Sequence, residues 1–166
     1  METKNPCMLI REANKNDCSL LAELIRDSFI TVANRFDLNK VNCPTHPSNC
    51  TTDWIEKDFT KGRKYYILES SGTPVGCVGL EKANVDLCYL ERLAVLPHHR
   101  NKGFGKALVD TVMYEAQALN VKRVSIGIIA DDVELKEWYQ KMGFIEEETK
   151  KFYHLPFMVT FMSYDF

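Results

Sequence analysis

One segment constrains the fold of this chain more than any other. Residues 91–109, ERLAVLPHHRNKGFGKALV, predict a strand that ends at Pro97, a short basic turn, and a helix that begins near Gly103. Gly103 and Gly105 lack a Cβ, so the main chain of this turn can approach a ligand closely. The first turn of the helix leaves N–H groups unpaired at the positive end of its dipole. A turn of this construction binds phosphate.

Three basic side chains, Arg100, Lys102 and Lys106, add positive charge to this turn. Two familiar phosphate motifs do not match it. A P-loop requires a different glycine spacing and a hydroxyl residue after the lysine. A dinucleotide-binding fingerprint requires a third glycine where this chain has Leu108. Both mismatches disfavour a nucleotide-binding module.

Length and composition predict a single domain over residues 1–166, with 45% hydrophobic and 27% charged residues as in soluble globular proteins. The net charge of −2 gives no support for nucleic acid as a partner. No apolar run reaches the length of a membrane span, and residues 1–6 lack the apolar region of a signal peptide. We therefore expect a cytoplasmic protein without a membrane partner, whose six cysteines are reduced.

A cluster of possible metal ligands lies in one predicted loop. Cys43, His46 and Cys50 could supply three zinc ligands. Their spacing does not match a standard zinc finger, and no second half follows, so a plain loop is favoured. The adjacent His98 and His99 are weaker candidates, because neighbouring side chains on an extended turn point apart. We expect no metal.

The pattern of apolar residues predicts the element order β-α-α-β-β-β-α-β-α-β-β. Four helices are expected, with N-caps at Asn16 or Asp17, at Thr51 or Thr52, near residue 102, and at Asp131 or Asp132. Gly62, Asn120 and Gly143 are the predicted helix ends. The predicted strands span residues 7–12, 64–69, 75–81, 85–96, 121–129, 144–148 and 157–164.

Two motifs in this order resemble those of a known family. Arg100-x-x-Gly103-x-Gly105, directly after a Leu-Ala-Val strand, resembles motif A of the GCN5-related N-acetyltransferases (GNAT). Tyr139-x-x-x-Gly143-Phe144, on the helix after strand 124–129, resembles motif B. The resemblance covers nearly the whole chain. It implies an α/β (α+β) GNAT fold, with a central mixed, largely antiparallel seven-stranded sheet, a parallel splayed pair and about four flanking helices.

The resemblance also implies acetyl-CoA as cosubstrate. The loop would hold the pyrophosphate of coenzyme A, and the pantothenate arm would pair with the main chain of the preceding strand, much as an added strand does. Asp132 stands where the family often carries Asn, and a carboxylate cannot donate the hydrogen bond that an amide donates. The implied coenzyme-binding residues are Leu93, Ala94, Val95, Arg100, Asn101, Lys102, Gly103, Phe104, Gly105, Lys106 and Asp132.

Two residues are candidates for the chemistry. The resemblance assigns Tyr139 to stabilise or protonate the leaving thiolate, although it could also be a core aromatic. Glu91 is the candidate base, either directly or through a water; alternatively it is a rim charge paired with Arg92 or a lysine. Strand alternation predicts that Glu91 shares a face with Tyr89 and Leu93, and Tyr89 could instead orient the substrate.

The same alternation places Cys88 on the opposite face from Glu91, which favours direct acetyl transfer in a ternary complex over an acetyl-cysteine intermediate. The acceptor site is expected between the first two helices, their connecting loop and the turn at 149–156. Its aromatic candidates favour a small-molecule primary amine. An N-terminal or lysine amine of a protein, a non-catalytic acyl-CoA sensor and a homodimer stay open. The candidate walls of this site are Phe36, His46, Trp54 and Phe157.

Overall fold

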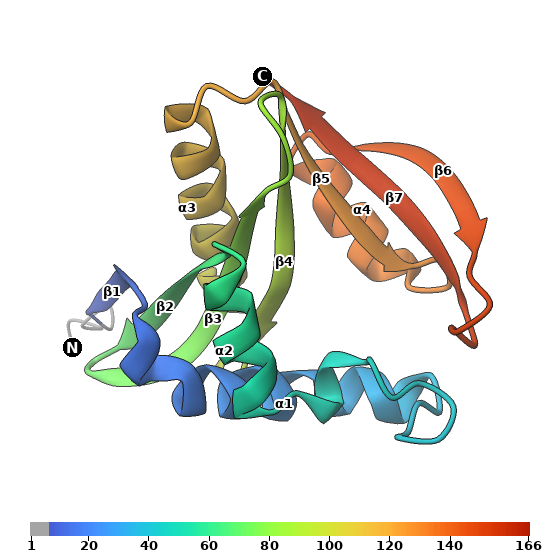
Figure 1. The fold of residues 1–166 in the computed structure, drawn as a ribbon, viewed down its shortest axis with the longest axis horizontal. Helices are drawn as coiled ribbons and strands as arrows, with labels where there is room; N and C mark the ends of the chain where they lie inside the picture. Colours follow the sequence, from blue (N-terminus) through green and yellow to red (C-terminus); the bar gives the residue numbers. More distant parts are fainter. Residues whose placement is uncertain (1–6) are drawn as a thin grey trace, which may run out of the picture.

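The computed structural model describes residues 7–166, which form one seven-stranded sheet in the order β1-β2-β3-β4-β5-β7-β6 (Figure 1). Every neighbouring pair in this sheet is antiparallel except β4 and β5, which are parallel. The predicted fold class is confirmed; the expectation about residues 1–6 lies outside the described residues. The strands are β1 (Met8–Glu12), β2 (Lys64–Ser70), β3 (Thr73–Lys82), β4 (Leu87–Val95), β5 (Arg123–Ile129), β6 (Ile145–Lys151) and β7 (Met158–Asp165).

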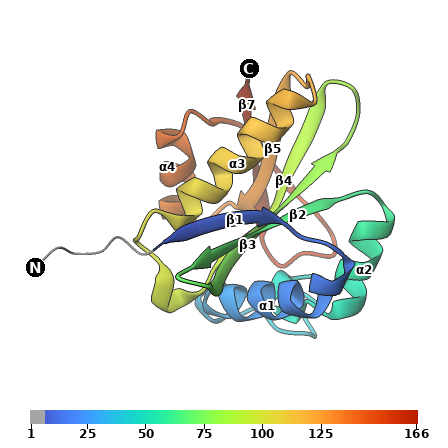
Figure 2. The same cartoon turned by 90° about the vertical axis from the view of Figure 1, so that its left-hand side faces the viewer.

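Helices cover both faces of the sheet, and Figure 2 shows α1 and α3 on opposite sides of strands β1–β4. In the described chain the α-helices are α1 (Cys18–Arg35), α2 (Thr52–Thr60), α3 (Phe104–Ala118) and α4 (Val133–Lys141), in the predicted order. Short 3₁₀ turns lie at η1 (Lys15–Asp17), η2 (Pro47–Asn49) and η3 (Pro97–His99). None of the helices in residues 7–166 combines the length and the hydropathy that crossing a bilayer requires.

The core has two parts, one on each face of the sheet. On one face α3 and α4 bury a cluster that includes Leu108, Val112 and Tyr139 against strands from both halves of the sheet. On the other face α1 and α2 bury a smaller cluster that includes Leu21, Ile25 and Ile55. We call these the α3/α4 face and the α1/α2 face. The split matters because the two faces of β4 carry different functional groups.

The entry to α1 differs in part from the prediction. Asp17 is the N-cap residue of α1, as predicted, but its side chain makes no capping hydrogen bond to this helix. The Asn14 amide oxygen accepts from the Asn16 main chain and begins η1. Asp17 accepts from the Asn14 main chain and from both terminal nitrogens of Arg11, each at 2.8 Å. The 3₁₀ turn therefore precedes α1, and the carboxylate binds β1 instead of capping the helix.

The parallel pair is short. Only Leu87, Cys88 and Tyr89 of β4 have partners in β5, namely residues 123–125, and the two strands then diverge. Figure 1 shows them close together at one end and far apart at the end nearer α1. Residues 90–95 of β4 consequently have no β5 neighbour, so the predicted splayed pair is confirmed.

A β-bulge interrupts β4 on its other edge. Cys77 of β3 pairs with Ala94 and Gly79 pairs with Glu91, so one β3 residue faces both Arg92 and Leu93. Arg92 adopts the left-handed conformation, with φ of 49°. The extra residue reverses the alternation of side chains, and the expectation that Glu91 and Leu93 share a face is wrong. Leu93 packs on the α3/α4 face, with Cys88 and Leu90, as Cys88 was predicted to do.

Candidate functional site

Residues 98–106, which we call the glycine loop, follow β4 and include the end of η3 and the first turn of α3. This segment presents main-chain donors to solvent. Gly103 caps α3 without a side-chain hydrogen bond, and Phe104 is buried beneath the loop. The N–H groups of residues 101–106 donate no hydrogen bond to any residue within 7–166. These donors lie at the positive end of the α3 dipole, so the loop can bind an anion.

The two glycines of the loop have different roles. Gly103 has φ of 84°, a conformation that side chains with a Cβ rarely adopt, and a Cβ built there would meet no atom within 4 Å. Gly105 has ordinary helical geometry, but a Cβ there would lie 3.3 Å from the Trp138 ring of α4. Gly103 therefore shapes the open turn, whereas Gly105 lets α3 pack closely against α4.

The Arg100 guanidinium is bound by protein groups. Its Nε donates to the Val95 carbonyl at 3.0 Å, its Nη1 to the Thr31 hydroxyl at 3.0 Å, and its Nη2 to the Ser28 carbonyl at 2.6 Å. Nε thus ties the glycine loop to β4, and the two terminal nitrogens tie it to α1. A direct phosphate contact by Arg100 stays a prediction, and it would require the guanidinium to leave these partners.

The lysines of the loop differ from each other. Lys106 lies 2.8 Å from Asp110, one turn further along α3, and both side chains are exposed. Lys102 is exposed and forms no ion pair with the described part of the chain. Lys102 thus differs from Lys106, whose charge is paired with Asp110, and from Arg100, whose nitrogens bond main-chain carbonyls and a hydroxyl. Asn101, with φ of 63°, makes the turn before Lys102.

The three predicted strand residues present their main chain beside the glycine loop. Leu93 and Val95 pack their side chains on the α3/α4 face, and Ala94 is buried on the α1/α2 face. None has a β5 partner. The Val95 carbonyl already accepts a hydrogen bond from Arg100. The other main-chain N–H and C=O groups on the free edge of β4 are therefore the ones that can bind an extended ligand.

Asp132 is occupied at both of its carboxylate oxygens. Oδ1 caps α4 by accepting from the Leu135 main chain at 3.3 Å, as the sequence predicted. Oδ2 lies 2.5 Å from Arg35 Nη2 at the end of α1. A coenzyme contact at Asp132 would therefore be made to a carboxylate whose charge Arg35 already balances, across the end where β4 and β5 have separated.

Tyr139 lies inside the α3/α4 core at 4% exposure. Its ring packs edge-on against Trp138 and Phe144, with centroid separations of 5.0 and 5.3 Å. Its hydroxyl makes no side-chain hydrogen bond with residues 7–166, and burial raises the pKa of the phenol above its ordinary value. Tyr139 is thus both a core aromatic and a protonated hydroxyl without a protein partner.

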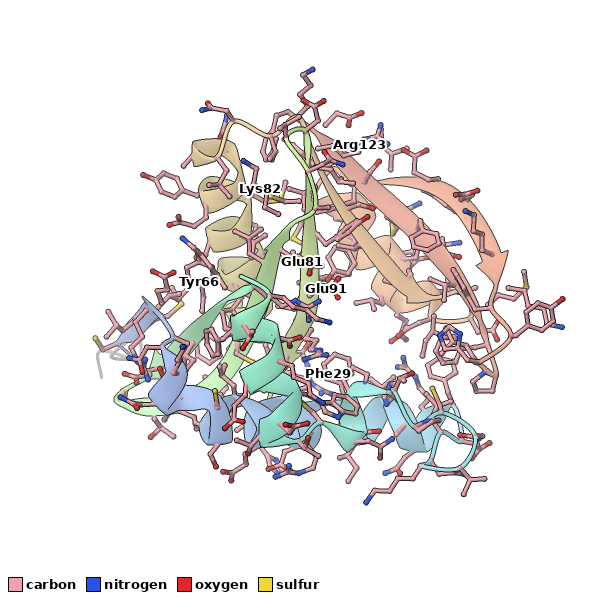
Figure 3. All side chains as sticks on the ribbon, in the orientation of Figure 1. Phe29, Tyr66, Glu81, Lys82, Glu91 and Arg123 are labelled. Carbon is pink, nitrogen blue, oxygen red and sulfur yellow. The ribbon has the colours of Figure 1, made fainter. Side chains whose placement is uncertain are left out.

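A network of charged groups lies on the α1/α2 face of β4, and Figure 3 shows Glu81 and Glu91 near each other on adjacent strands. Its centre is Asp58 of α2, which is 7% exposed. One oxygen of this carboxylate accepts from the Tyr65 hydroxyl at 2.7 Å and from Arg92, and lies 3.2 Å from Arg63 Nη1. We call the six residues of this network the charged cluster: Asp58, Arg63, Tyr65, Glu81, Glu91 and Arg92.

The cluster fixes the bulge of β4. Arg92, the residue with positive φ, donates to Asp58 and, at 3.0 Å, to the Tyr65 hydroxyl. Its guanidinium carbon lies 5.6 Å from the centroid of the Trp54 ring. A strained backbone position persists when its surroundings over-determine it. These contacts to α2 and β2 supply that constraint, and they hold Glu91 on the α1/α2 face.

Glu91 has a partly exposed side chain, at 35%, and its partner is Arg63 rather than Arg92, with Glu91 Oε1 3.9 Å from Arg63 Nη2. Burial raises the pKa of the Glu91 carboxyl above its ordinary value; Arg63 opposes this rise and Glu81 adds to it. A carboxylate with a raised pKa at an accessible position can take up a proton from a ligand.

The four predicted walls of the acceptor site are not equivalent. His46 is 6% exposed, with Nδ1 2.7 Å from the Ser48 hydroxyl, and burial lowers its pKa to about 4. It is therefore a neutral residue that caps η2 inside the loop, which corrects its expected exposure to an acceptor. Trp54 lies beneath Arg92, Phe36 packs under Arg35 at 4.7 Å, and Phe157 is half-buried in the β6–β7 turn.

The loop around His46 shows no metal centre. Cys43 and Cys50 are buried free thiols, and no group of three or more His, Cys, Asp or Glu residues in the described chain is arranged to hold an ion.

Two surface hollows lie away from these residues. The first, of about 560 Å³, is lined by Asp86 and Asp165, and the second, of about 470 Å³, by Tyr114. None of the predicted site residues lines either hollow.

Asp58 and Arg63 were not predicted as site residues. One sequence signal was present: Asp58 follows Trp54 and Ile55 by four and three positions, so α2 carries a carboxylate on its apolar side. A charge in that position requires a buried partner. The partners themselves, Arg63, Tyr65 and Arg92, come from separate segments and no spacing rule identifies them.

Comparison with known proteins agrees with this arrangement. A model of the acetyltransferase (GNAT) family matches residues 21–144. The uncharacterized N-acetyltransferase YjgM of Escherichia coli strain K12 is 31% identical over 86 residues, covering 50% of this chain and 52% of that protein. The chain thus matches about half the length of this curated relative.

Solved structures with low sequence identity share the fold. The structure of yncA from Salmonella typhimurium with its cofactor acetyl-CoA has a TM-score of 0.70 at 19% identity, covering 95% of this chain and 93% of that one. The PaiA N-acetyltransferase from Thermoplasma acidophilum with coenzyme A gives 0.72 at 16%, covering 96% and 99%. The ribosomal-protein-alanine N-acetyltransferase from Brucella melitensis gives 0.71 at 21%, covering 95% and 99%.

Proposed function

Because this chain belongs to the acetyltransferase (GNAT) family, we propose that it is an acetyl-CoA-dependent N-acetyltransferase that acts on a primary amine. The observation that carries the proposal is the pairing of two features across β4. Free main-chain donors lie at the glycine loop, and a carboxylate with a raised pKa lies on the α1/α2 face. Two proteins of the same fold hold acetyl-CoA or coenzyme A, which supports the same cosubstrate here.

The glycine loop is the proposed site for the pyrophosphate. Its N–H groups at residues 101–106 would bind the phosphate oxygens, and Lys102 would add a full positive charge. The open space beside Gly103 allows the approach, because no protein atom occupies it. The pantothenate arm would run along the edge of β4 that β5 leaves free and pair with the main chain of residues 93–95.

Glu91 is the proposed base. A lysine-like amine has a pKa of about 10.4, so it must lose a proton before it can attack the thioester. Glu91 would take this proton directly or through a water, while the Val95 N–H polarises the thioester carbonyl. Cys88 lies on the opposite face with its side chain buried, which supports direct transfer to the amine over an acetyl-cysteine intermediate.

Tyr139 is proposed to stabilise the leaving thiolate. A free thiol has a pKa of about 8.5 and a tyrosine about 10, and burial raises the Tyr139 value further. Full proton transfer from Tyr139 to the thiolate is therefore unfavourable, and donation of a hydrogen bond is the better role. We expect Tyr139→Phe to reduce kcat about tenfold and to leave the Kd of acetyl-CoA unchanged. Full activity in this variant would remove the assignment.

The proposed acceptor is the primary amine of a small molecule. Aromatic residues of α1 and α2, Phe29 and Trp54, pack on the α1/α2 face that also carries Glu91, and Figure 3 labels Phe29 below Glu91 in that view. Trp54 lies beside the charged cluster on α2. Apolar rings next to a carboxylate fit an amine that carries an alkyl or aryl group, because the ring contacts bind the chain and the carboxylate binds the ammonium.

The test combines binding with turnover. Calorimetry should show that acetyl-CoA and coenzyme A bind, and a panel of amines should then release free thiol, with the acetylated amine identified by mass spectrometry. Binding without thiol release for any small amine, protein N-terminus or lysine would indicate an acyl-CoA sensor. Absence of binding to both coenzyme forms would refute the proposal and leave only the fold.

A further inference from the structure

The charged cluster contains a residue whose position bears directly on the proposed base. We propose that Arg63 is a positioning residue, whose guanidinium holds the Glu91 carboxylate ionised and in place on the α1/α2 face. This inference rests on the proposed function, because it names what prepares the base of that reaction. Arg63 does not touch the reacting atoms in this proposal; it acts through Glu91.

The backbone on both sides of Arg63 fixes the position of its Cα. This residue follows α2 and precedes β2, immediately after Gly62, whose φ of 90° reverses the chain direction. The Arg63 main chain donates to the Asp58 carbonyl at 3.0 Å, which completes the turn. Because both flanking elements are packed, the Cα of Arg63 has a fixed place beside β3 and β4, and its side chain is 13% exposed.

The side chain is then oriented by three carboxylates from three different elements. Nη1 lies 3.2 Å from Asp58 of α2, while Nη2 lies 3.5 Å from Glu81 of β3 and 3.9 Å from Glu91 of β4. Nε is buried and has no hydrogen-bond partner in the described chain. Nε therefore stays without a hydrogen bond within residues 7–166, whereas both terminal nitrogens lie near carboxylates. This arrangement indicates that the carboxylates determine the orientation of the guanidinium.

The charges of the cluster explain why Arg63 matters to Glu91 in particular. Asp58 is already balanced by Arg92 and receives a hydrogen bond from Tyr65. Arg63 lies closest to Asp58 through Nη1, while its Nη2 is shared between Glu81 and Glu91, two carboxylates on neighbouring strands. If Arg63 were neutral, these two carboxylates would lose the cation that lies between them, and the pKa of Glu91 would rise.

The groups that face Glu91 come from every element around it. Burial raises its pKa, Arg63 and Arg92 lower it, and Glu81 and Asp58 raise it further. Arg63 has the strongest opposing effect among these charges. An opposite charge within about 4–6 Å lowers a carboxyl pKa by about 1–3 pH units, and partial exposure places this pair at the lower end of that range.

The experiment is a direct titration of Glu91. Protein labelled with ¹³C at glutamate carboxyl carbons is titrated by NMR, and the Glu91 signal is assigned by its loss in Glu91→Gln. In Arg63→Met, which keeps the aliphatic length, we expect the Glu91 midpoint to rise by about one pH unit, a tenfold change in proton affinity. In Arg63→Lys, which keeps the charge, less than half of this rise is expected.

A second variant tests the same arrangement in the opposite direction. Glu81→Gln removes the carboxylate that shares Arg63, so the Glu91 midpoint should fall. This variant keeps the inference falsifiable if Arg63→Met does not fold. An unchanged Glu91 midpoint in folded Arg63→Met, or in Glu81→Gln, would overturn the inference, since a purely structural arginine would change stability without moving this titration.

Turnover separates this inference from the proposed function. In Arg63→Met the acid limb of the pH profile of kcat/KM should shift to higher pH by the same amount as the NMR midpoint. The Kd of coenzyme A should stay constant. If wild-type protein binds coenzyme but acetylates no amine, the proposed function fails and the titration still decides the role of Arg63. If wild-type protein is active and the midpoint does not move, only the inference fails.

Discussion

The glycine loop and the charged cluster lie close to the same strand, β4, but they are built in different ways. The loop offers main-chain N–H groups together with the exposed Lys102, while the terminal nitrogens of Arg100 bond α1 and Lys106 pairs with Asp110. The cluster offers side chains alone, gathered from α2, β2, β3, β4 and the α2–β2 turn. One site is continuous in sequence and the other is assembled by the fold.

This difference predicts a separation of effects. Substitutions in the glycine loop should change coenzyme affinity and leave the chemistry of the bound complex nearly intact. Substitutions in the charged cluster should change turnover or folding and leave coenzyme affinity nearly intact. A variant that crosses these categories would show that the two sites are coupled through β4.

The largest effect is expected at Glu91. Glu91→Gln keeps the size of the side chain but cannot accept the proton, so kcat should fall about 100- to 1000-fold with an unchanged coenzyme Kd. In the wild type, activity should be lost as pH falls through a Glu91 pKa that lies above the ordinary carboxyl value of 4.5. The pH–rate profile checks this, because the acid limb should disappear in the variant. An unchanged profile would exclude Glu91 as the base.

The next effect is on folding. Asp58→Asn leaves Arg63 and Arg92 inside the protein without their shared carboxylate, and we expect a loss of about 2–3 kcal/mol in the free energy of unfolding. Tyr65→Phe is the matched control, since it removes one hydrogen bond to the same oxygen and should cost about 1 kcal/mol. Urea unfolding measures both. Equal losses would show that the charge pairing contributes nothing beyond the hydroxyl contact.

A smaller effect is expected at Gly103 in the loop. Gly103→Val places a β-branched residue at a φ of 84° and should weaken coenzyme binding about tenfold. Gly103→Asn should stay within about threefold, because asparagine tolerates the left-handed conformation. Calorimetry of coenzyme A binding compares the two. Similar losses in both variants would mean that the side chain blocks the ligand and that backbone strain is not the cause.

The smallest effect concerns the ion pair between α1 and α4. Arg35→Ala should weaken coenzyme binding about threefold, because the Asp132 carboxylate would then repel an anionic ligand. The double variant Arg35→Ala/Asp132→Asn should recover the affinity. We expect a coupling of no more than about 1 kcal/mol, since Arg35 is half exposed. Additive losses in the cycle would place Asp132 outside the coenzyme site.

The element order, the family motifs and the glycine loop could be predicted because their signals are local. Gly103 and Pro97 specify a turn through their own backbone preferences, and the apolar period of α3 follows directly. The orientation of Arg100 could not be predicted in the same way. Its partners Ser28 and Thr31 lie about seventy positions earlier in the chain, and no pattern connects them to the loop.

The phase of β4 shows a different limit. Alternation predicted that Glu91 and Leu93 share a face, and the bulge at Arg92 reverses this. The local sequence gives no warning, because a bulge residue with positive φ is usually Gly or Asn. Arg92 adopts this conformation because Asp58 and Tyr65 bind its guanidinium, and those partners lie on other elements. The bulge is therefore a tertiary effect that the segment alone does not specify.

Only three residue pairs join β4 to β5 in the described chain. Beyond these pairs, side-chain packing in the α3/α4 core, and not main-chain hydrogen bonding between β4 and β5, holds the two halves of the sheet together. An extended thioester arm laid along the bare edge would act as a temporary eighth strand, shielding β4 amides from deuterium exchange. Occupancy would then appear as thermal resistance, worth about 2.7 kcal/mol at a hundredfold excess over Kd. The cosubstrate would thus occupy the free edge of β4 as well as supply the acetyl group.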